Sequence, residues 1–194
     1  RSILVFVCLL HSAFAQNHLD SMDATVRLGI HEKHFPGGIL WFQHGEKIYH
    51  KAYGNRTLVS NITPNSKGTL YDAASLTKVV ATTPAIMLLV ERGLIDLTKT
   101  AATYVPEFVG DGKERILVRQ LMTHTSGLRP GISRKPDWSG YNEGLKRIWA
   151  EKPIHEPDTK FVYSDINFIL LGELVRRVSG LPLNEFCKKE IFGP

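Results

Sequence analysis

Cysteine is scarce in this sequence, and long apolar segments are absent from it. The 194 residues include two cysteines, Cys8 and Cys187. Because Cys8 falls in an N-terminal segment that we expect to be removed, Cys187 remains alone and an internal disulfide is excluded. No stretch has the roughly 20 consecutive apolar residues that a membrane-spanning helix needs. We therefore expect no disulfide framework, and no stable membrane span after processing.

The charge balance excludes further classes of partner. Lys and Arg number 24 against 19 Asp and Glu, a net charge of +5, and the charges are dispersed without a basic run. This pattern lacks the electrostatic footprint of a nucleic-acid-binding protein. No glycine-rich nucleotide-binding motif is present either, so we expect neither a nucleic-acid partner nor a cofactor. The apolar fraction of 43% is typical of a globular protein, and the length predicts a single domain.

The first fifteen residues have the pattern of a secretory signal. Arg1 precedes an apolar run at residues 3–10, and residues 13–15 (Ala-Phe-Ala) supply a small-residue cleavage site. We predict a signal peptide at residues 1–15 and an exported protein, either periplasmic or secreted. The alternative is that this segment is an N-terminal core strand or an uncleaved anchor.

A histidine pair invites comparison with a zinc motif. In residues 31–34 (His-Glu-Lys-His) the two histidines are three positions apart. The helical zinc motif of metalloproteases has them four apart, and no distant third ligand is indicated here. We expect no metal site.

Apolar periodicity predicts a helix, a hairpin and then mostly helices. The first helix covers residues 20–34, and strands at 39–43 and 47–53 flank a turn, followed by a polar loop at 54–68. Residues 79–91 are apolar nearly all round, which predicts a helix buried in a large core, and Pro84 should kink or break it. Further helices are expected at residues 116–123, 142–150, 166–178 and 183–187.

The most informative motif lies where a small-residue turn meets the start of this apolar helix. Residues 75–78 read Ser-Leu-Thr-Lys. At this spacing Ser75 and Lys78 share one helix face, so the amine can reach the hydroxyl. The helix N-terminus adds unpaired N–H groups and the positive end of the dipole, which together make an activated nucleophile. Partial burial would lower the pKa of Lys78 and make it a better base. The alternative is a pair on a solvated face.

A second polar group follows the short apolar run that ends at Tyr163. This tyrosine stands on the turn before the helix at residues 166–178. If it faces Lys78, the cation lowers the pKa of the phenol, and Tyr163 can act as general base on Ser75 and later as acid on the leaving group. The alternative is that Tyr163 packs a loop and that Ser164 or Asp165 only caps a helix.

Three motifs in a fixed order give the chain a resemblance to a known family. They are residues 75–78, residues 121–128 (Leu-Met-Thr-His-Thr-Ser-Gly-Leu) and residues 161–167 (Phe-Val-Tyr-Ser-Asp-Ile-Asn). From about Asp20 to its last residue, the chain resembles the serine β-lactamase-related hydrolases, which include class C β-lactamases, D-alanyl-D-alanine carboxypeptidases and related esterases. The resemblance implies the α+β fold of serine β-lactamases and penicillin-binding proteins: an antiparallel sheet flanked by helices, with a helical subdomain inserted after the first strands.

The resemblance also implies residue roles. Ser75 would be the acylated nucleophile, Lys78 its activating partner and Tyr163 the base. The oxyanion hole would combine the N–H of Ser75 with one from a strand near the C-terminus. His124 is a tempting base, but in this family its turn shapes the helical part, so we favour a structural role for it.

The sequence departs from the family's pattern at two points. Position 165, where the family commonly has Asn, is Asp; an ionised Asp accepts hydrogen bonds without donating to a substrate carbonyl, and near Lys78 it would hold the lysine protonated. We assign Asp165 to substrate binding and rank ester or peptide hydrolysis above β-lactam turnover. The family's Lys-Thr-Gly or His-x-Gly strand motif is absent, so residues 16–194 are interpreted as an incomplete, N-terminal portion of the domain without its C-terminal strands.

Two functions stay open. The first is an exported serine hydrolase that forms an acyl-enzyme with an ester or amide: a cell-wall (peptidoglycan) peptide, a β-lactam or a small ester. The alternative is a non-catalytic, penicillin-binding-like binding or sensor domain. By itself the 194-residue chain is expected to have little or no activity, because half of the oxyanion hole would be missing.

Overall fold

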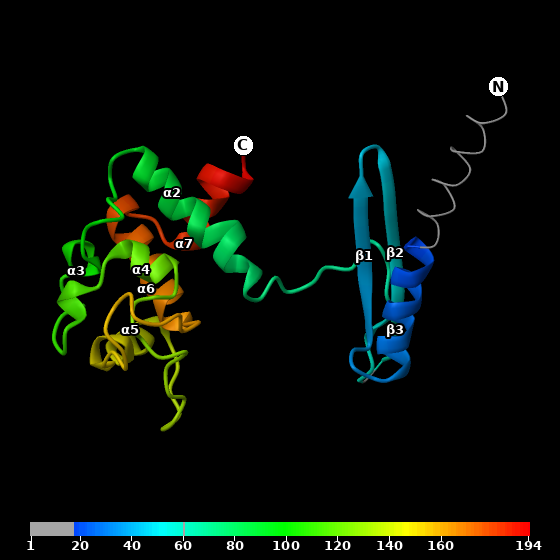
Figure 1. Ribbon diagram of the computed structural model, residues 1–194, viewed down its shortest axis with the longest axis horizontal. Coiled ribbons are helices and arrows are strands. Elements are labelled where there is room, and N and C mark those ends of the chain that lie inside the picture. Colours follow the sequence, from blue (N-terminus) through cyan, green and yellow to red (C-terminus); the bar gives the residue numbers. More distant parts are fainter. Residues whose placement is uncertain (1–17, 60) are drawn as a thin grey trace. The chain divides into compact units, whose positions relative to one another are not determined.

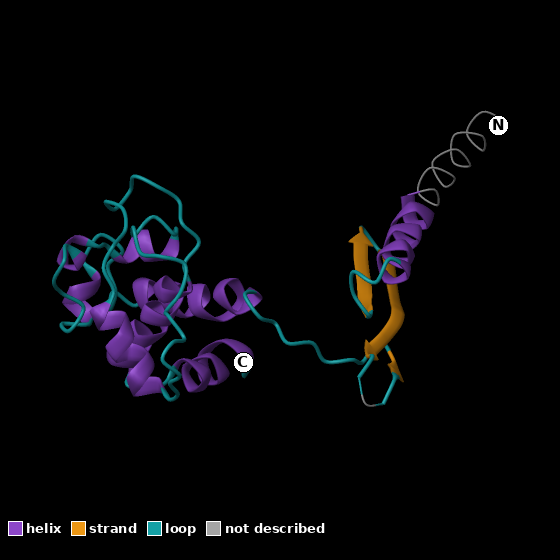
Figure 2. Cartoon of the chain, turned by 90° about the horizontal axis from the view of Figure 1, so that it is seen from below, coloured by secondary structure: helices purple, strands orange, loops and turns teal. Residues whose placement is uncertain are grey.

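The computed structural model describes residues 18–59 and 61–194, which form parts of two compact units (Figures 1 and 2). The first unit runs to Asp72, and the second spans Ala73–Pro194. The predicted signal peptide, residues 1–15, lies outside the described residues. Among the residues described, no helix has both the length and the apolarity needed to cross a membrane.

The first unit packs a helix at residues 18–31 beside a small antiparallel sheet. Strands β1 (Gly37–His44) and β2 (Lys47–Thr57) pair as a hairpin, as predicted, and the turn between them contains Gly45 at φ +59°. The predicted loop at 54–68 is partly wrong, because β2 continues to Thr57 and pairs with a short third strand, β3 (Thr63–Pro64). Strand β3 consists of Thr63 and Pro64 and pairs with β2 through its backbone. A search for apolar periodicity does not detect a strand of this composition.

Polar contacts join this helix to the hairpin. The Asp23 carboxylate accepts hydrogen bonds from Lys51 and from the Tyr49 hydroxyl, both on β2, and from Arg27 one helical turn away. One carboxylate therefore fixes the register of the helix against the strand, and it does so while accepting from two cations.

The second unit is helical and is organised around one long helix. Helix α6 (Asp165–Ser179) contacts several other helices of this unit and buries Ile166, Leu170 and Leu174 at helical spacing. The other elements are the π-helix η1 (Lys78–Thr82), α2 (Thr83–Glu91), α3 (Ala101–Tyr104), η2 (Lys113–Arg115), α4 (Val118–Met122), α5 (Tyr141–Ala150), α7 (Leu183–Cys187) and η3 (Lys188–Phe192). Cys187 is buried with its thiol free.

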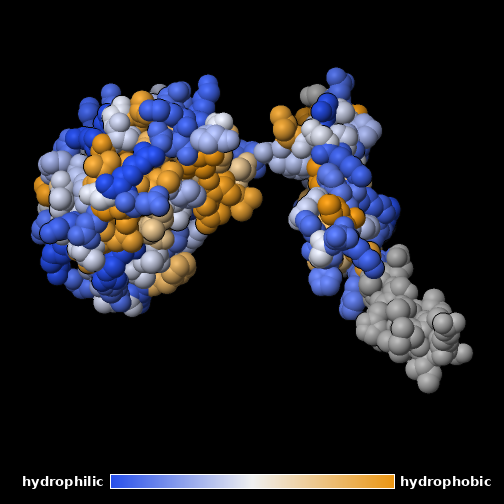
Figure 3. All heavy atoms as spheres, turned by 90° about the horizontal axis from the view of Figure 1, so that it is seen from above, coloured by the Kyte–Doolittle hydropathy of each residue, from blue (hydrophilic) through white to orange (hydrophobic). Residues whose placement is uncertain are grey.

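At the predicted kink or break near Pro84 the helix changes from π to α without an interruption of helical backbone, and the predicted all-round burial is wrong. A π-turn precedes the proline, because the Thr83 N–H bonds to the Lys78 carbonyl five residues back. Only the face carrying Ile86 and Leu89 packs into the core, whereas Val79 is 61% exposed. Within Ala73–Pro194 no element covers that second face, and apolar side chains are visible on the surface of this unit (Figure 3).

A tight turn sets the position of the segment that follows α4. The carbonyl of Gly127 accepts hydrogen bonds from the N–H groups of Ile154 and His155. Gly127 has φ +81°, and a Cβ there would lie 2.0 Å from the His155 carbonyl oxygen. Only glycine fits this position, because both the backbone conformation and the neighbouring carbonyl exclude a side chain.

We predict that Gly127→Ala lowers the free energy of unfolding by about 2–4 kcal/mol, because the methyl group must displace backbone. Gly131→Ala is the matched control, since a Cβ there meets nothing within 4 Å. The control should change stability by less than about 0.5 kcal/mol. Urea unfolding followed by circular dichroism measures both variants, and equal stabilities would contradict the assignment.

Candidate active site

The serine of the first motif sits at a strained turn just before η1. Ala74 has φ +43°, a conformation that costs energy for a residue with a Cβ. Ser75 follows it and is exposed. Its N–H finds no acceptor within the described part of the chain, whereas the next three N–H groups are bonded to carbonyls of residues 73–75. The turn thus presents a hydroxyl and a free amide donor together.

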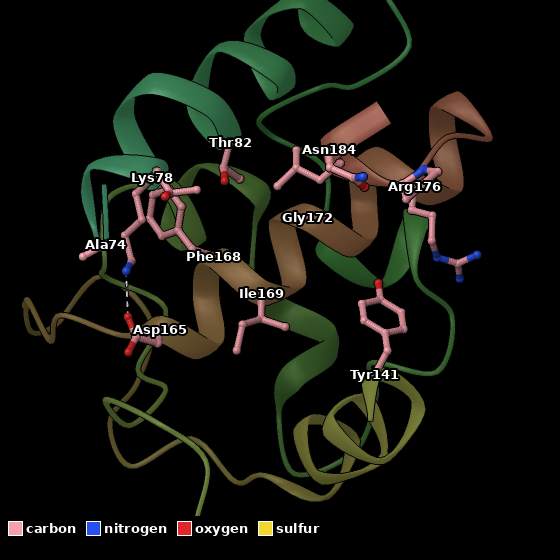
Figure 4. Close-up of a pocket in the computed structure, with 13 residues that line it drawn as sticks. Ala74, Lys78, Thr82, Tyr141, Asp165, Phe168, Ile169, Gly172, Arg176 and Asn184 are labelled. Carbon is pink, nitrogen blue, oxygen red and sulfur yellow. Dashed lines mark hydrogen bonds and ion pairs between the residues drawn. The ribbon is translucent and has the colours of Figure 1, made fainter. Parts of the chain in front are cut away.

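Lys78 links the two halves of the site. Its ammonium donates to Ser75 Oγ at 3.2 Å and to Asp165 Oδ1 at 2.7 Å. The lysine side chain is 13% exposed and the Asp165 side chain 60% exposed. Figure 4 shows the two side chains pointing toward each other, one from the start of η1 and one from the start of α6.

The third predicted residue lies beside them. The Lys78 ammonium is 4.9 Å from the centroid of the Tyr163 ring, within the range of a cation–π contact. Hydrogen bonding to the Ser75 hydroxyl, followed by that to Lys78, lowers the pKa of the Tyr163 phenol. The structure therefore brings the hydroxyl of Ser75, the amine of Lys78 and the phenol of Tyr163 together.

The protonation of Lys78 differs from one expectation and agrees with another. Burial lowers the pKa of Lys78, as expected for a desolvated base, but hydrogen bonds to Asp165 and Tyr163 outweigh burial and raise the pKa overall. The expectation that partial burial makes Lys78 a better base by lowering its pKa is therefore wrong. The expectation that Asp165 holds the lysine protonated agrees with this geometry.

The ring of His124 packs against the ring of Tyr163. Its ring centroid lies 4.5 Å from that of Tyr163, and its Nδ1 accepts the Ser164 N–H at 3.0 Å. The proton of the neutral imidazole is therefore on Nε2. Burial, and secondarily the charge of Lys78, lowers the pKa of His124 and keeps the ring neutral. Its partners are the Ser164 backbone, the Asn167 amide at 3.4 Å and aromatic rings, in agreement with the structural role that the sequence favours.

Neighbouring loops hold the start of α6 in place. Ser164 occupies the N-cap position without capping the helix, because its hydroxyl donates to the Arg129 carbonyl at 2.7 Å. The Asp165 N–H donates to the Pro130 carbonyl, also at 2.7 Å. These bonds orient the backbone that carries Tyr163 and Asp165, so that both side chains reach Lys78.

A cavity of about 740 Å³ adjoins the site. It runs from Lys78 and Asp165 along α6 past Ile169 and Gly172 toward Tyr141 (Figure 4). Sequence reasoning missed this cavity, although a signal existed: positions 165, 169, 172 and 176 share one face of a helix. Its lining residues are Ala74, Thr77, Lys78, Thr82, Tyr141, Asp165, Phe168, Ile169, Gly172, Arg176, Pro182, Leu183 and Asn184.

Metal ligands are not gathered at this site. Among the residues that the structure describes, no group of three or more His, Cys, Asp or Glu side chains could hold a metal ion. His31 and His34 lie in the first unit, at and just after the end of its helix.

The environments of two tyrosines lead to a testable contrast. We predict that Tyr163 titrates below the ordinary value near 10, whereas burial and then the Glu173 carboxylate raise the pKa of Tyr141 to about 12. Carbon-13 NMR of labelled tyrosine rings, assigned with Tyr163→Phe and Tyr141→Phe, measures both. Lys78→Met should raise the pKa of Tyr163 and leave that of Tyr141 unchanged. A Tyr163 signal that does not respond to Lys78→Met would contradict this geometry.

Curated proteins of similar sequence include a carboxypeptidase and an amidase. The chain is 27% identical over 159 residues to a putative D-alanyl-D-alanine carboxypeptidase of Salmonella agona, covering 75% of this chain and 37% of that protein. It is 31% identical over 180 residues to an N-acetylmuramyl-L-alanine amidase of Bacillus subtilis, covering 82% and 41%. The chain thus spans less than half the length of these relatives.

Solved structures that superpose on this chain support the predicted fold. A class C beta lactamase superposes with a TM-score of 0.77 at 24% identity, covering 92% of this chain and 49% of that one. A beta-lactamase/D-alanine carboxypeptidase from Pseudomonas syringae gives 0.73 at 24%, covering 91% and 49%. These likenesses confirm the α+β, serine β-lactamase-like fold class.

The model of a protein family described as Beta-lactamase matches residues 22–194. This match covers most of the chain, including all three motifs that carry the resemblance. The chain belongs to the beta-lactamase family.

Proposed function

We propose that the protein is an exported serine hydrolase that works through an acyl-enzyme. The observation that carries the proposal is the shared ammonium of Lys78, which contacts Ser75 Oγ and lies over the ring of Tyr163. Membership of a hydrolase family supports the reaction class. Export is supported by the signal-like pattern of residues 1–15 and by the cell-wall components named in the relatives' descriptions.

The proposed first step transfers the proton of Ser75 to Tyr163. Because the pKa of the phenol is lowered, a phenolate beside a protonated Lys78 is the available base. As Tyr163 takes the proton, Ser75 Oγ bonds to the carbonyl carbon of the substrate, and the free N–H of Ser75 faces the developing oxyanion. Tyr163 then returns the proton to the leaving group, and water hydrolyses the resulting ester.

The proposed substrate is an ester or amide of small-molecule or peptide size. Candidates are a cell-wall peptide, a β-lactam and a small ester. Asp165 favours the ester and the peptide, because its carboxylate cannot donate a hydrogen bond to a substrate carbonyl. The relatives named above include a D-alanyl-D-alanine carboxypeptidase and an amidase, which adds support for a peptide.

A second candidate is a binding or sensor domain without turnover. The ion pair between Asp165 and Lys78 favours it, because the pairing keeps the lysine protonated and unable to act as a base. Such a domain would bind a ligand in the same cavity reversibly and would leave Ser75 unmodified.

A fluorophosphonate probe separates the two candidates. In the protein expressed from its complete gene, we predict covalent labelling at Ser75, located by peptide mass spectrometry and lost in Ser75→Ala. Ser139→Ala, which removes an exposed hydroxyl outside the cavity, should label normally. Tyr163→Phe should slow labelling by about 10²–10⁴-fold. Binding without labelling, or undiminished labelling of Ser75→Ala, would refute the hydrolase.

The pH dependence follows from the two pKa shifts. Labelling should accelerate as pH rises through the lowered pKa of the Tyr163 phenol, because the phenolate is the base. It should decline only at high pH, where Lys78, whose pKa is raised, loses its proton. A rate that falls as the phenol of Tyr163 loses its proton would contradict the proposed base.

A further inference from the structure

Asp165 has one carboxylate oxygen that the described residues leave open. Lys78 donates to Oδ1, and no other described side chain or backbone group donates to this carboxylate. The side chain is 60% exposed and lines the cavity. Figure 4 shows that only one of its two oxygens is joined to Lys78. The second oxygen is therefore an unused acceptor beside the nucleophile.

The distances place this acceptor within reach of a specific part of the substrate. The Lys78 ammonium is 3.2 Å from Ser75 Oγ and 2.7 Å from Asp165 Oδ1, so Oγ and Oδ1 are no further apart than the sum of these distances, and the open oxygen, Oδ2, is bonded to the same carbon as Oδ1. In an acyl group attached to Ser75, a substituent on the carbon next to the carbonyl is three bonds from Oγ. A donor there extends toward the Asp165 carboxylate, and a hydrogen bond of ordinary length would join it to Oδ2.

A second cation on the same carboxylate has precedents in this chain. Glu173 accepts from both Arg176 and Arg177, and Asp23 accepts from both Arg27 and Lys51. The presence of Lys78 on Oδ1 is therefore compatible with an ammonium on the other oxygen.

The cavity wall strengthens the discrimination between a donor and an acceptor. Phe168 and Ile169 line the cavity one helical turn beyond Asp165. These apolar side chains keep water from one side of the carboxylate, so an acceptor that faces it there loses hydration without gaining a donor, although the exposed remainder of the carboxylate stays screened by water. An acylated nitrogen keeps a single N–H donor and adds a carbonyl acceptor, whereas a free ammonium group brings three donors and a positive charge.

From this geometry we propose that Asp165 selects acyl groups that carry a free α-amino group. The substrate class is then an ester or amide of an amino acid whose amine is unblocked, and N-acylated compounds are disfavoured. This inference rests on the proposed acylation of Ser75. Asp165 acts here as a residue that determines specificity, in addition to holding Lys78 protonated.

A pair of boronic acids tests this inference without depending on which leaving group the protein prefers. Boronates add reversibly to an activated serine, so (1-aminoethyl)boronic acid and its N-acetyl derivative differ only in the group that faces Asp165. Each is titrated for protection of Ser75 from the fluorophosphonate probe, in the protein expressed from its complete gene. We expect the free amine to protect at least 10-fold more tightly, and Asp165→Asn to reduce that preference by at least 10-fold.

The ratio of the two affinities isolates the role of Asp165. Asp165→Asn also alters the reactivity of Ser75 through Lys78, but both boronates bond to the same serine, so that effect cancels in the ratio. Asp137→Asn is the matched control, because it removes the same charge at an exposed position outside the cavity. It should leave the ratio unchanged.

The outcomes distinguish this inference from the function on which it rests. If Ser75 is labelled but the wild-type protein shows no preference for the amine, or Asp165→Asn leaves the preference within twofold, the inference fails and the hydrolase stands. An equal shift in Asp137→Asn also overturns it, because the effect would then be a general effect of charge. If the wild-type Ser75 is never labelled, the proposed function fails as well.

Discussion

The ammonium of Lys78 is the group on which the site depends. It is mostly buried, and it lies between a hydroxyl, a carboxylate and the face of a phenol. Burying a charge is costly unless it is paired and hydrogen-bonded. Asp165 supplies that pairing, so the lysine keeps its charge. In the proposed mechanism the base is therefore Tyr163, and the carboxylate of Asp165 is the group that a substrate would meet beside the serine.

The scaffold delivers these groups from two separate segments of the second unit. Ser75 and Lys78 come from the turn before η1 and from its first residue, whereas Tyr163 and Asp165 come from the segment before α6 and from its first residue. The second segment is fixed by bonds from the Ser164 and Asp165 N–H groups to His124 and Pro130, and from the Ser164 hydroxyl to the Arg129 carbonyl. Because side-chain positions within a fraction of an ångström matter for proton transfer, backbone held by several bonds is a physical requirement of the arrangement.

Much of this arrangement could be predicted from the sequence, and the failures have physical causes. Hairpin strands and α6 follow from apolar periodicity, and the Ser-x-x-Lys spacing places hydroxyl and amine on one face. Composition alone could not show that one face of the η1–α2 segment lies open, because burial depends on what packs against a helix. The sign of the Lys78 pKa shift was also ambiguous, since burial and Asp165 act in opposite directions. The stacking of His124 under Tyr163 needs three-dimensional proximity that spacing does not encode.

The most direct measurement of the central claim is the titration of Lys78 itself. Carbon-13 NMR at the lysine Cε, assigned with Lys78→Met, reports the pKa of this one amine. The account predicts a pKa above the ordinary value for lysine, and a decrease when Asp165→Asn removes the partner that holds the charge. A Lys78 that titrates below the ordinary value, with no response to Asp165→Asn, would contradict the account, because burial would then dominate and the lysine would be the base.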